Sequence, residues 1–440
     1  MAELDAILGR FTDPVTGSLH GATFVAVDRE GKDIYRKSFG HQKVDTSNSP
    51  ALTPDTVTWI ASQSKLTTSV SVMQIVERRL INLDDDVREV LPQLKELKVL
   101  TGFEGEDEST ANGEAKSHVD LEEVGQRKLH GVQSSEKKSK GSPILEDVKG
   151  PITLRQLISH SSGLCYDLGN PLLIKYSAWA DRKDNMFSGT MEGNFHPLVF
   201  QPGTSWQYGP GLDWAGRVVA QLTGMSLDEY QQRNIWGPLG AESTTFFPSK
   251  RGIKPEDVQE MAYRAAGEST QDLKKGSSPW KFDCRDDLGG AGLYSTANDY
   301  SKLLAALLAD GGPLLSKASV DEMFRAQLGP VPVASLREFI VGTDTKNTKS
   351  LLWTQTLEEW RDVMEIGHCL CGVVNNEDVA GRRKKNTVSW DGMPNLLWFI
   401  DRESGVAATF FTQLLPVGDL PLRLVMLELE KALYKMVNSR

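Results

Sequence analysis

A serine and a lysine three residues apart, Ser62 and Lys65, form the pair in this sequence best suited to chemistry. Positions i and i+3 share a face of an α-helix, so the hydroxyl and the amine can touch. An amine that burial keeps neutral can take the proton of the hydroxyl and make the serine a nucleophile. Ser64 lies between them but is offset from Lys65 by one residue, so we expect it to face away. Because the pattern also arises by chance, the prediction depends on what the chain places beside it.

We expect the pair at the start of a buried helix that follows Trp59. Backbone N–H groups at a helix N-terminus favour a developing negative charge, which suits a serine that becomes an oxyanion centre. Apolar side chains then recur every three or four residues, and this spacing predicts one buried stripe. The stripe consists of Leu66, Val70, Met73, Val76 and Leu80.

Two further segments carry side chains that could complete such a site. Tyr208 follows the turn-forming pair Pro202-Gly203 and precedes a predicted helix, and a tyrosine near cationic groups can serve as a base. Residues 390–394 (WDGMP) lead into a predicted strand, where a glycine lets a substrate approach the backbone closely. A glycine-rich segment at 289–296 lacks the spacing of phosphate and dinucleotide loops, so we interpret it as packing.

The motifs occur in a fixed order: Ser62-x-x-Lys65, residues 154–164 (LRQLISHSSGL), Trp206-Gln207-Tyr208, and Trp390-Asp391-Gly392. Together they resemble the serine β-lactamase and penicillin-binding-protein superfamily. The resemblance is greatest to its class C-like branch with the family VIII esterases, and within that branch to the lovastatin side-chain transesterases of filamentous fungi. Residues 208–216 (YGPGLDWAG) and the run from 381 to 398 are what indicate the fungal group.

The resemblance implies a role for each residue of the site. Ser62 would be the nucleophile, Lys65 would help to deprotonate it, and Tyr208 would be the general base for acylation and relay the proton in deacylation. The backbone N–H groups of Ser62 and Met393 would form the oxyanion hole. No metal or other cofactor is expected. Three residues are expected to contact the substrate: Trp390, Gly392 and Trp206. Trp390 would line the acyl pocket.

Two departures from the superfamily pattern narrow the expected substrate. True β-lactamases carry Lys-Thr-Gly as the third motif, and its cation receives the carboxylate of the antibiotic. Here Trp390-Asp391-Gly392 takes that place without a cation. The second motif, Tyr-x-Asn in class C enzymes, is here Tyr208-Gly209-Pro210, and proline offers no side-chain amide. Both changes argue against antibiotic hydrolysis and favour a neutral ester or thioester.

The implied reaction is an acyl transfer in secondary metabolism. An acyl group would pass from a thioester or an acyl carrier domain through acyl-Ser62 to a hydroxyl of a small natural product. A carboxylesterase-type hydrolase, with water as acceptor, needs the same residues, so the sequence leaves it open. A non-catalytic binding protein on the same fold is disfavoured by the intact set of Ser62, Lys65 and Tyr208.

We expect an α/β (α+β) fold of the β-lactamase type, formed by residues 1–440 as a single catalytic unit. Near the N-terminus, two strands at 22–28 and 33–39 are predicted from the hairpin signal at 30–32 (EGK). Near the C-terminus, apolar patterns with a period of two predict strands at 395–401 and 406–414, and strands at both ends suggest one antiparallel sheet with flanking helices. The sheet subdomain would span 1–58 and 290–440, and a mostly helical subdomain would be inserted at 59–289. Residues 104–142, rich in charge, Ser and Gly, are predicted to form a flexible insertion.

Composition narrows the partners and the compartment. A net charge of −10 disfavours binding to nucleic acid or to an anionic membrane. No signal peptide or apolar run of roughly 18 residues is visible, so we expect a cytoplasmic enzyme without a membrane anchor. Four cysteines without a metal-binding or C-x-x-C spacing are interpreted as free thiols.

Two other clusters have ordinary interpretations. We interpret His160 as a structural histidine that orders the Ser161-Ser162-Gly163 turn, and find no partner for His368. The basic run 382–385 (RRKK) is interpreted as a solvated loop, with contact to an acyl carrier as the alternative.

Overall fold

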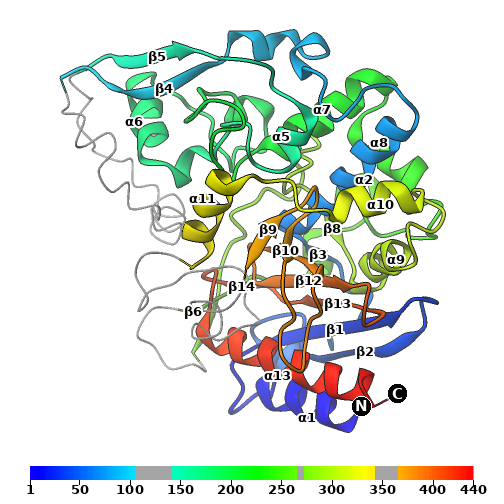
Figure 1. Ribbon diagram of the computed structural model, residues 1–440. Coiled ribbons are helices and arrows are strands. Elements are labelled where there is room, and N and C mark those ends of the chain that lie inside the picture. The colour runs from blue at the N-terminus through cyan, green and yellow to red at the C-terminus, as the bar shows by residue number, and fades with distance from the viewer. Residues whose placement is uncertain (106–140, 265–271, 342–364, 440) are drawn as a thin grey trace.

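The computed structural model describes residues 1–105, 141–264, 272–341 and 365–439. Within these ranges, a seven-stranded antiparallel sheet has the order β2-β1-β13-β12-β11-β10-β9 (Figure 1). Strands from the two ends of the chain pair directly, because β1 lies between β2 and β13. The predicted sheet from both termini is therefore confirmed. The strands are β1 (Gly21–Asp28), β2 (Asp33–Gly40), β9 (Ile366–His368), β10 (Val373–Asn375), β11 (Val388–Gly392), β12 (Leu396–Asp401) and β13 (Val406–Phe411).

The sheet is buried on both faces, and successive side chains along each strand point into the core on opposite faces. In β1, Val25 and Val27 belong to the core on one face, whereas Phe24 and Ala26 belong to the core on the other. Helices from the two chain ends, α1 (Ala2–Phe11) and α13 (Leu420–Val437), cover the second face (Figure 1). On the first face, α9 (Ala297–Leu308) packs against β1 and β13.

The middle of the chain contributes most of the remaining helices. A short strand pair, β3 (Thr58–Trp59) with β8 (Tyr294–Ser295), lies where the chain enters and leaves this region. The placement agrees with a helical insertion in the sheet, while the subdomain boundaries at 59 and 289 stay a prediction. The helices are α2 (Ser64–Glu77), α5 (Leu154–Ile158), α6 (Pro171–Trp179), α7 (Gly211–Thr223), α8 (Leu227–Gln231), α10 (Lys317–Phe324) and α11 (Pro330–Val341); further strands are β4 (Lys98–Phe103), β5 (Pro143–Asp147), β6 (Ala262–Arg264), β7 (Leu273–Lys275) and β14 (Leu414–Leu415).

Helix α2 differs from the predicted one-stripe helix. All its residues from Ser64 to Ile75 are buried, because α7, α8 and α10 pack around it. The prediction that Leu80 continues the buried stripe is wrong. The helix ends at Glu77, Arg79 adopts a left-handed conformation (φ 58°), and the side chain of Leu80 is 45% exposed.

The basic run 382–385 was interpreted as a solvated loop, and for its two arginines this is wrong. The side chains of Arg382 and Arg383 are buried. Arg383 donates to both carboxylate oxygens of Glu430 at 3.1 Å, and to the hydroxyl of Ser389 at 3.0 Å. A buried carboxylate on α13 therefore holds the arginine inside, as expected for a charge taken out of water. The arginines form part of the interior and not a surface for an acyl carrier.

The predicted flexible insertion at 104–142 lies almost entirely outside the described residues, between β4 and β5. In the described part of the chain, no helix combines the length and the apolar content needed to cross a bilayer.

Candidate active site

Ser62 lies in a tight 3-10 turn, Ala61–Gln63, that leads directly into α2. The turn begins at Ala61, whose φ of 45° is unusual for a residue with a side chain and marks local strain. Ser62 is half-buried, in contrast to the fully buried residues on both sides of it. The hydroxyl is therefore presented at the start of a helix, as predicted, but from the turn before it.

Lys65 reaches back to Ser62 from the first turn of α2. Its Nζ lies 3.2 Å from Oγ of Ser62 and also donates to the hydroxyl of Tyr166 at 3.1 Å and to the carbonyl of Gly290 at 2.6 Å. Burial lowers the pKa of Lys65 to about 7, although the carboxylates of Asp213 and Asp391 oppose the shift. An appreciable fraction of the amine is therefore neutral near pH 7.

Tyr208 approaches Ser62 from the loop before α7. Its hydroxyl donates to Oγ of Ser62 at 2.6 Å and lies 3.4 Å from Nε1 of Trp390. The ring also lies below the amine of Lys65, 4.6 Å from Nζ to the ring centroid. Burial raises the pKa of Tyr208 well above its usual value, despite the hydrogen bond to Ser62, which lowers it. The phenol is thus protonated at rest, unlike the phenolate that a shifted tyrosine base would present.

Three residues that contact or hold Lys65 were missed by the sequence reasoning. Tyr166 and Asp213 were not among the predicted site residues, and the glycine-rich segment with Gly290 was interpreted as packing. In the structure, the Gly290 N–H donates to Oδ1 of Asp213 at 2.8 Å, while the Gly290 carbonyl accepts from Lys65. Burial raises the pKa of Asp213 to about 6, and the charge of Lys65 opposes this. The signal available in the sequence was Asp213 itself, a carboxylate between the apolar residues Leu212 and Trp214 in the first turn of α7.

Strand β11 supplies the other wall of the site. Trp390 is buried beside Tyr208, with their rings 5.3 Å apart. At Gly392, a Cβ atom would lie 2.6 Å from the carbonyl of Ile60, so the missing side chain lets the strand end approach the turn that carries Ser62. Met393 follows, half-buried, at the same strand end. The close neighbour of Gly392 is therefore the Ser62 turn, whereas the sequence suggested a substrate.

A small cavity adjoins this wall, and Lys65 and Trp390 are among the residues that line it. Trp206, expected to contact substrate, is 3% exposed. It packs against His160, His368 and Phe339 at 5.1 to 5.9 Å between ring centroids. Substrate contact by Trp206 stays a prediction. The cavity is lined by Lys65, Ser69, Ile158, His160, Leu212, His368, Cys371, Gly372 and Trp390.

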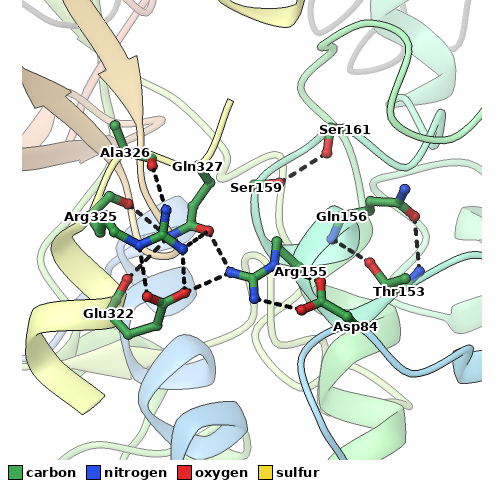
Figure 2. Close-up of polar contacts among 10 residues, drawn as sticks. All are labelled: Asp84, Thr153, Arg155, Gln156, Ser159, Ser161, Glu322, Arg325, Ala326 and Gln327. Atoms are coloured by element: carbon green, nitrogen blue, oxygen red, sulfur yellow. Dashed lines mark hydrogen bonds and ion pairs between the residues drawn. The ribbon is translucent and has the colours of Figure 1, made fainter. Parts of the chain in front are cut away.

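The segment around His160 is anchored to two distant parts of the chain. Thr153 and Gln156 form a capping box at the start of α5, and Arg155 pairs with Asp84 and with Glu322 on α10 (Figure 2). Arg155 also donates to Gln327, whose backbone N–H donates to the carbonyl of His368. His368, for which no partner was foreseen, lies 5.4 Å from His160 between ring centroids. The motif at 154–164 thus connects the helical region to the edge of the sheet.

The arrangement places the Ser62 hydroxyl within hydrogen-bonding distance of both an amine with a lowered pKa and a phenol. Ser62 and Lys65, from one motif, and Tyr208, from another, converge here. Trp390 and Gly392 lie on the facing strand β11, and Met393 directly follows it. Such a set can deprotonate a serine and move its proton, which is the chemistry of acyl transfer.

Comparisons with known proteins agree with this geometry and with the predicted family. The beta-lactamase family model matches residues 10–430. The chain is 33% identical to the lovastatin esterase of Penicillium rubens, covering 92% of each protein. It is 30% identical to the monacolin J acid methylbutanoyltransferase of Aspergillus terreus, covering 94% of this chain and 91% of that one. The structure matches unliganded simvastatin synthase from Aspergillus terreus with a TM-score of 0.82 and 28% identity, covering 98% of this chain and 97% of that one. The chain therefore belongs to the beta-lactamase family.

Proposed function

We propose that this protein is a serine acyltransferase that works through an acyl-Ser62 intermediate. The observation that carries the proposal is the placement of Oγ of Ser62 between the hydroxyl of Tyr208, at 2.6 Å, and Nζ of Lys65, at 3.2 Å. A serine that contacts both an amine with a lowered pKa and a phenol is suited to nucleophilic catalysis. Names of the relatives support the reaction class, because they include both acyltransferases and an esterase.

In the acylation step, the neutral amine of Lys65 accepts the proton of Ser62 as Oγ attacks the acyl carbonyl carbon of the donor. The bond to the donor thiol or alcohol then breaks. Tyr208, protonated at rest, gives its proton to the leaving group and regains one from Lys65, so it acts as a relay. This assignment refines the expectation of Tyr208 as the general base, because a phenol with a raised pKa does not take a proton unaided.

The backbone N–H groups of Ser62 and Met393 are proposed as the oxyanion hole. Ser62 lies in the first turn of a helical segment, where N–H groups have no intrahelical acceptor. The close approach of Gly392 to Ile60 brings the strand end with Met393 to the same place. One such donor typically contributes about 3–4 kcal/mol of transition-state stabilisation. Trp390, Gly392 and Trp206 remain the proposed substrate contacts.

The acceptor is proposed to be a hydroxyl of a small molecule, and the donor an acyl thioester or an acyl carrier domain. Relatives named for transfer of a methylbutanoyl group to monacolin J acid and to ML-236A carboxylate support a small-molecule acceptor. A thioester or carrier-bound donor, and a cytoplasmic location, come from the sequence resemblance and composition and form part of the proposal.

Hydrolysis is the second candidate, and one observation favours it. The lovastatin esterase of Penicillium rubens is 33% identical to this chain, above the 30% of the acyltransferases compared. In a hydrolase, water takes the place of the acceptor hydroxyl, and the acylation step is unchanged.

The experiment that tests the proposal measures how the acyl-enzyme is partitioned. The protein is incubated with a short branched acyl thioester and rising concentrations of small secondary alcohols, and ester and free acid are quantified. Transferase activity predicts that ester formation rises with alcohol while total turnover stays the same or increases. Free acid as the sole product with every alcohol would refute the transferase proposal and support the hydrolase. Absence of an acyl or fluorophosphonate adduct on Ser62 in folded protein would instead favour a non-catalytic binding protein.

A further inference from the structure

Both backbone amides that flank Tyr208 donate hydrogen bonds to one residue, His160. The N–H of Gln207 donates to the His160 carbonyl at 3.0 Å, and the N–H of Gly209 donates to Nδ1 of its ring at 3.4 Å. The Tyr208 carbonyl, in turn, accepts from the N–H of Tyr166 at 3.2 Å. The backbone on both sides of Tyr208 is thereby held against the segment that follows α5.

The side chains of the two residues are also in direct contact. The ring of His160 meets the ring of Tyr208 edge to face, with centroids 4.8 Å apart. His160 is 2% exposed, and Trp206, His368 and Trp390 surround the rest of its ring. A ring packed in this way limits how far the Tyr208 side chain can move from its position.

The protonation state of His160 agrees with its role as an acceptor. Nδ1 can accept the Gly209 N–H only in the neutral ring with its proton on Nε2. Burial, together with the nearby His368 and Lys65, lowers the pKa of His160 well below its ordinary value. The neutral form is therefore the resting form.

The backbone of His160 is held in an unfavourable conformation. Its φ is 59°, in the left-handed region that few residues with side chains adopt. The anchors on either side maintain it: Ser161 donates its N–H to the carbonyl of Gln156 and accepts from Gly203, and Arg155 pairs with Asp84 and Glu322 (Figure 2). Strain of this kind persists where the surrounding structure imposes it, and it accumulates near functional sites.

We infer that His160 is a positioning residue for the reaction, which holds the hydroxyl of Tyr208 at hydrogen-bonding distance from Ser62. Sequence reasoning assigned His160 to the Ser161-Ser162-Gly163 turn alone. The inference rests on the proposed function, because positioning affects catalysis only if Tyr208 moves the proton of Ser62.

Two substitutions separate the contributions of His160. His160→Gly tolerates the positive φ but removes both the ring and its acceptor. His160→Asn also tolerates that φ, and its Oδ1 occupies about the place of Nδ1, so the Gly209 N–H keeps an acceptor. We expect kcat for acylation to fall about 10- to 100-fold in His160→Gly with KM changed less than about threefold, and to recover at least about threefold in His160→Asn.

The decisive measurement repeats His160→Gly in a Tyr208→Phe background. If His160 acts through Tyr208, its loss lowers kcat no further there, because the group it positions is already absent. His196→Asn is the matched control, since His196 is also buried and its Nδ1 contacts the Pro197 carbonyl, away from Tyr208. We expect it to leave kcat within about twofold.

Two results would overturn the inference: an equal loss of kcat in both backgrounds, or a folded His160→Gly protein with the kcat of the parent. If His160→Gly does not fold, His160→Asn replaces it in the two backgrounds, and a loss of kcat of the same size in both again overturns the inference. Failure of the proposed function itself is distinct, because the unsubstituted protein would then form no acyl-Ser62 adduct.

Discussion

The hydroxyl of Tyr208 donates a hydrogen bond of 2.6 Å to Oγ of Ser62, although 146 residues separate the two in the chain. Lys65, by contrast, contacts the same oxygen from only three residues away. One contact is a consequence of helical periodicity, and the other depends on packing of α7 against α2. The proposed chemistry needs both.

Replacing Ser62 tests whether it is the nucleophile. Ser62→Ala is expected to abolish the acyl adduct in intact-mass measurements. The melting temperature should stay nearly unchanged, because the half-buried side chain loses only its hydroxyl group. Ser64→Ala is the control. Ser64 donates to the Ala61 carbonyl at 2.6 Å and accepts from the Leu293 N–H at 3.1 Å, so its loss should destabilise the protein by about 1–2 kcal/mol without preventing the adduct. An adduct on Ser62→Ala would refute the assignment.

Replacing Tyr208 tests the proton relay. Tyr208→Phe keeps the ring packed but removes the hydroxyl, and turnover should fall by about two to four orders of magnitude. Rapid-quench measurement of acyl-enzyme formation with a chromogenic ester separates this from an effect on binding. Tyr300→Phe also loses a buried phenol, one that donates to the Gln63 carbonyl at 3.0 Å, and should retain turnover within about threefold. Normal turnover in Tyr208→Phe would rule out the relay.

The rate of acylation should depend on pH through Lys65. The neutral amine is the active form, so its fraction rises as pH increases through about 7, the pKa to which burial lowers Lys65. We expect the acylation rate to increase about tenfold per pH unit well below that value and to level off above it. Because Lys65 and Asp213 interact, the apparent pKa belongs to the pair. A rate that is flat from pH 5 to 9 would contradict a titrating amine.

Asp213→Asn provides a directional check on the same titration. The amide oxygen can still accept the Gly290 N–H, but the negative charge that favours protonated Lys65 is lost. The pKa of Lys65 should therefore fall, and the acid limb of the pH profile should move to lower pH by about one unit. Asp299→Asn, a buried carboxylate with partners at Ser243 and Lys302, should leave the limb in place. If the acid limb does not move in Asp213→Asn, the charge of Asp213 does not influence the pKa of Lys65.

Gly392 is expected to be sensitive because of its distance to the turn before Ser62. A Cβ atom there would lie 2.6 Å from the carbonyl of Ile60, so Gly392→Ala must displace either the strand end or the turn. We expect a loss of about 1–3 kcal/mol in the free energy of unfolding and a fall in kcat of about 100-fold. Gly329→Ala, with nothing within 4 Å of the new methyl group, is the control for stability and for kcat. Wild-type kcat in Gly392→Ala would show that the approach does not matter.

Predictions from the sequence were most accurate where a short pattern contains its own physical cause. The period of two in β12 and β13 predicted strands, and both strands are buried on both faces in the structure. In α13, apolar side chains such as Leu422, Val425 and Leu429 recur every three or four residues, and in the structure this face of the helix is buried in the core on the sheet. The prediction that Leu80 is buried was wrong because a periodic pattern contains no information on where a helix ends. The prediction that Arg383 lies in a solvated loop was wrong because its burial depends on Glu430, 47 residues away.

For the site, residue type and spacing were sufficient to select Ser62 and Lys65, because an i, i+3 pair is local geometry. Motif order then supplied Tyr208 and the strand with Trp390. Folding decided which groups surround the amine: Tyr166, Gly290 and Asp213 come from three separate segments, and each meets Lys65 or its partner through long-range packing. Folding also buried the amine and the phenol, and this desolvation moves their pKa values in opposite directions. The chain thus encodes its nucleophile locally, whereas the protonation states that make it reactive arise only when distant segments exclude water around it.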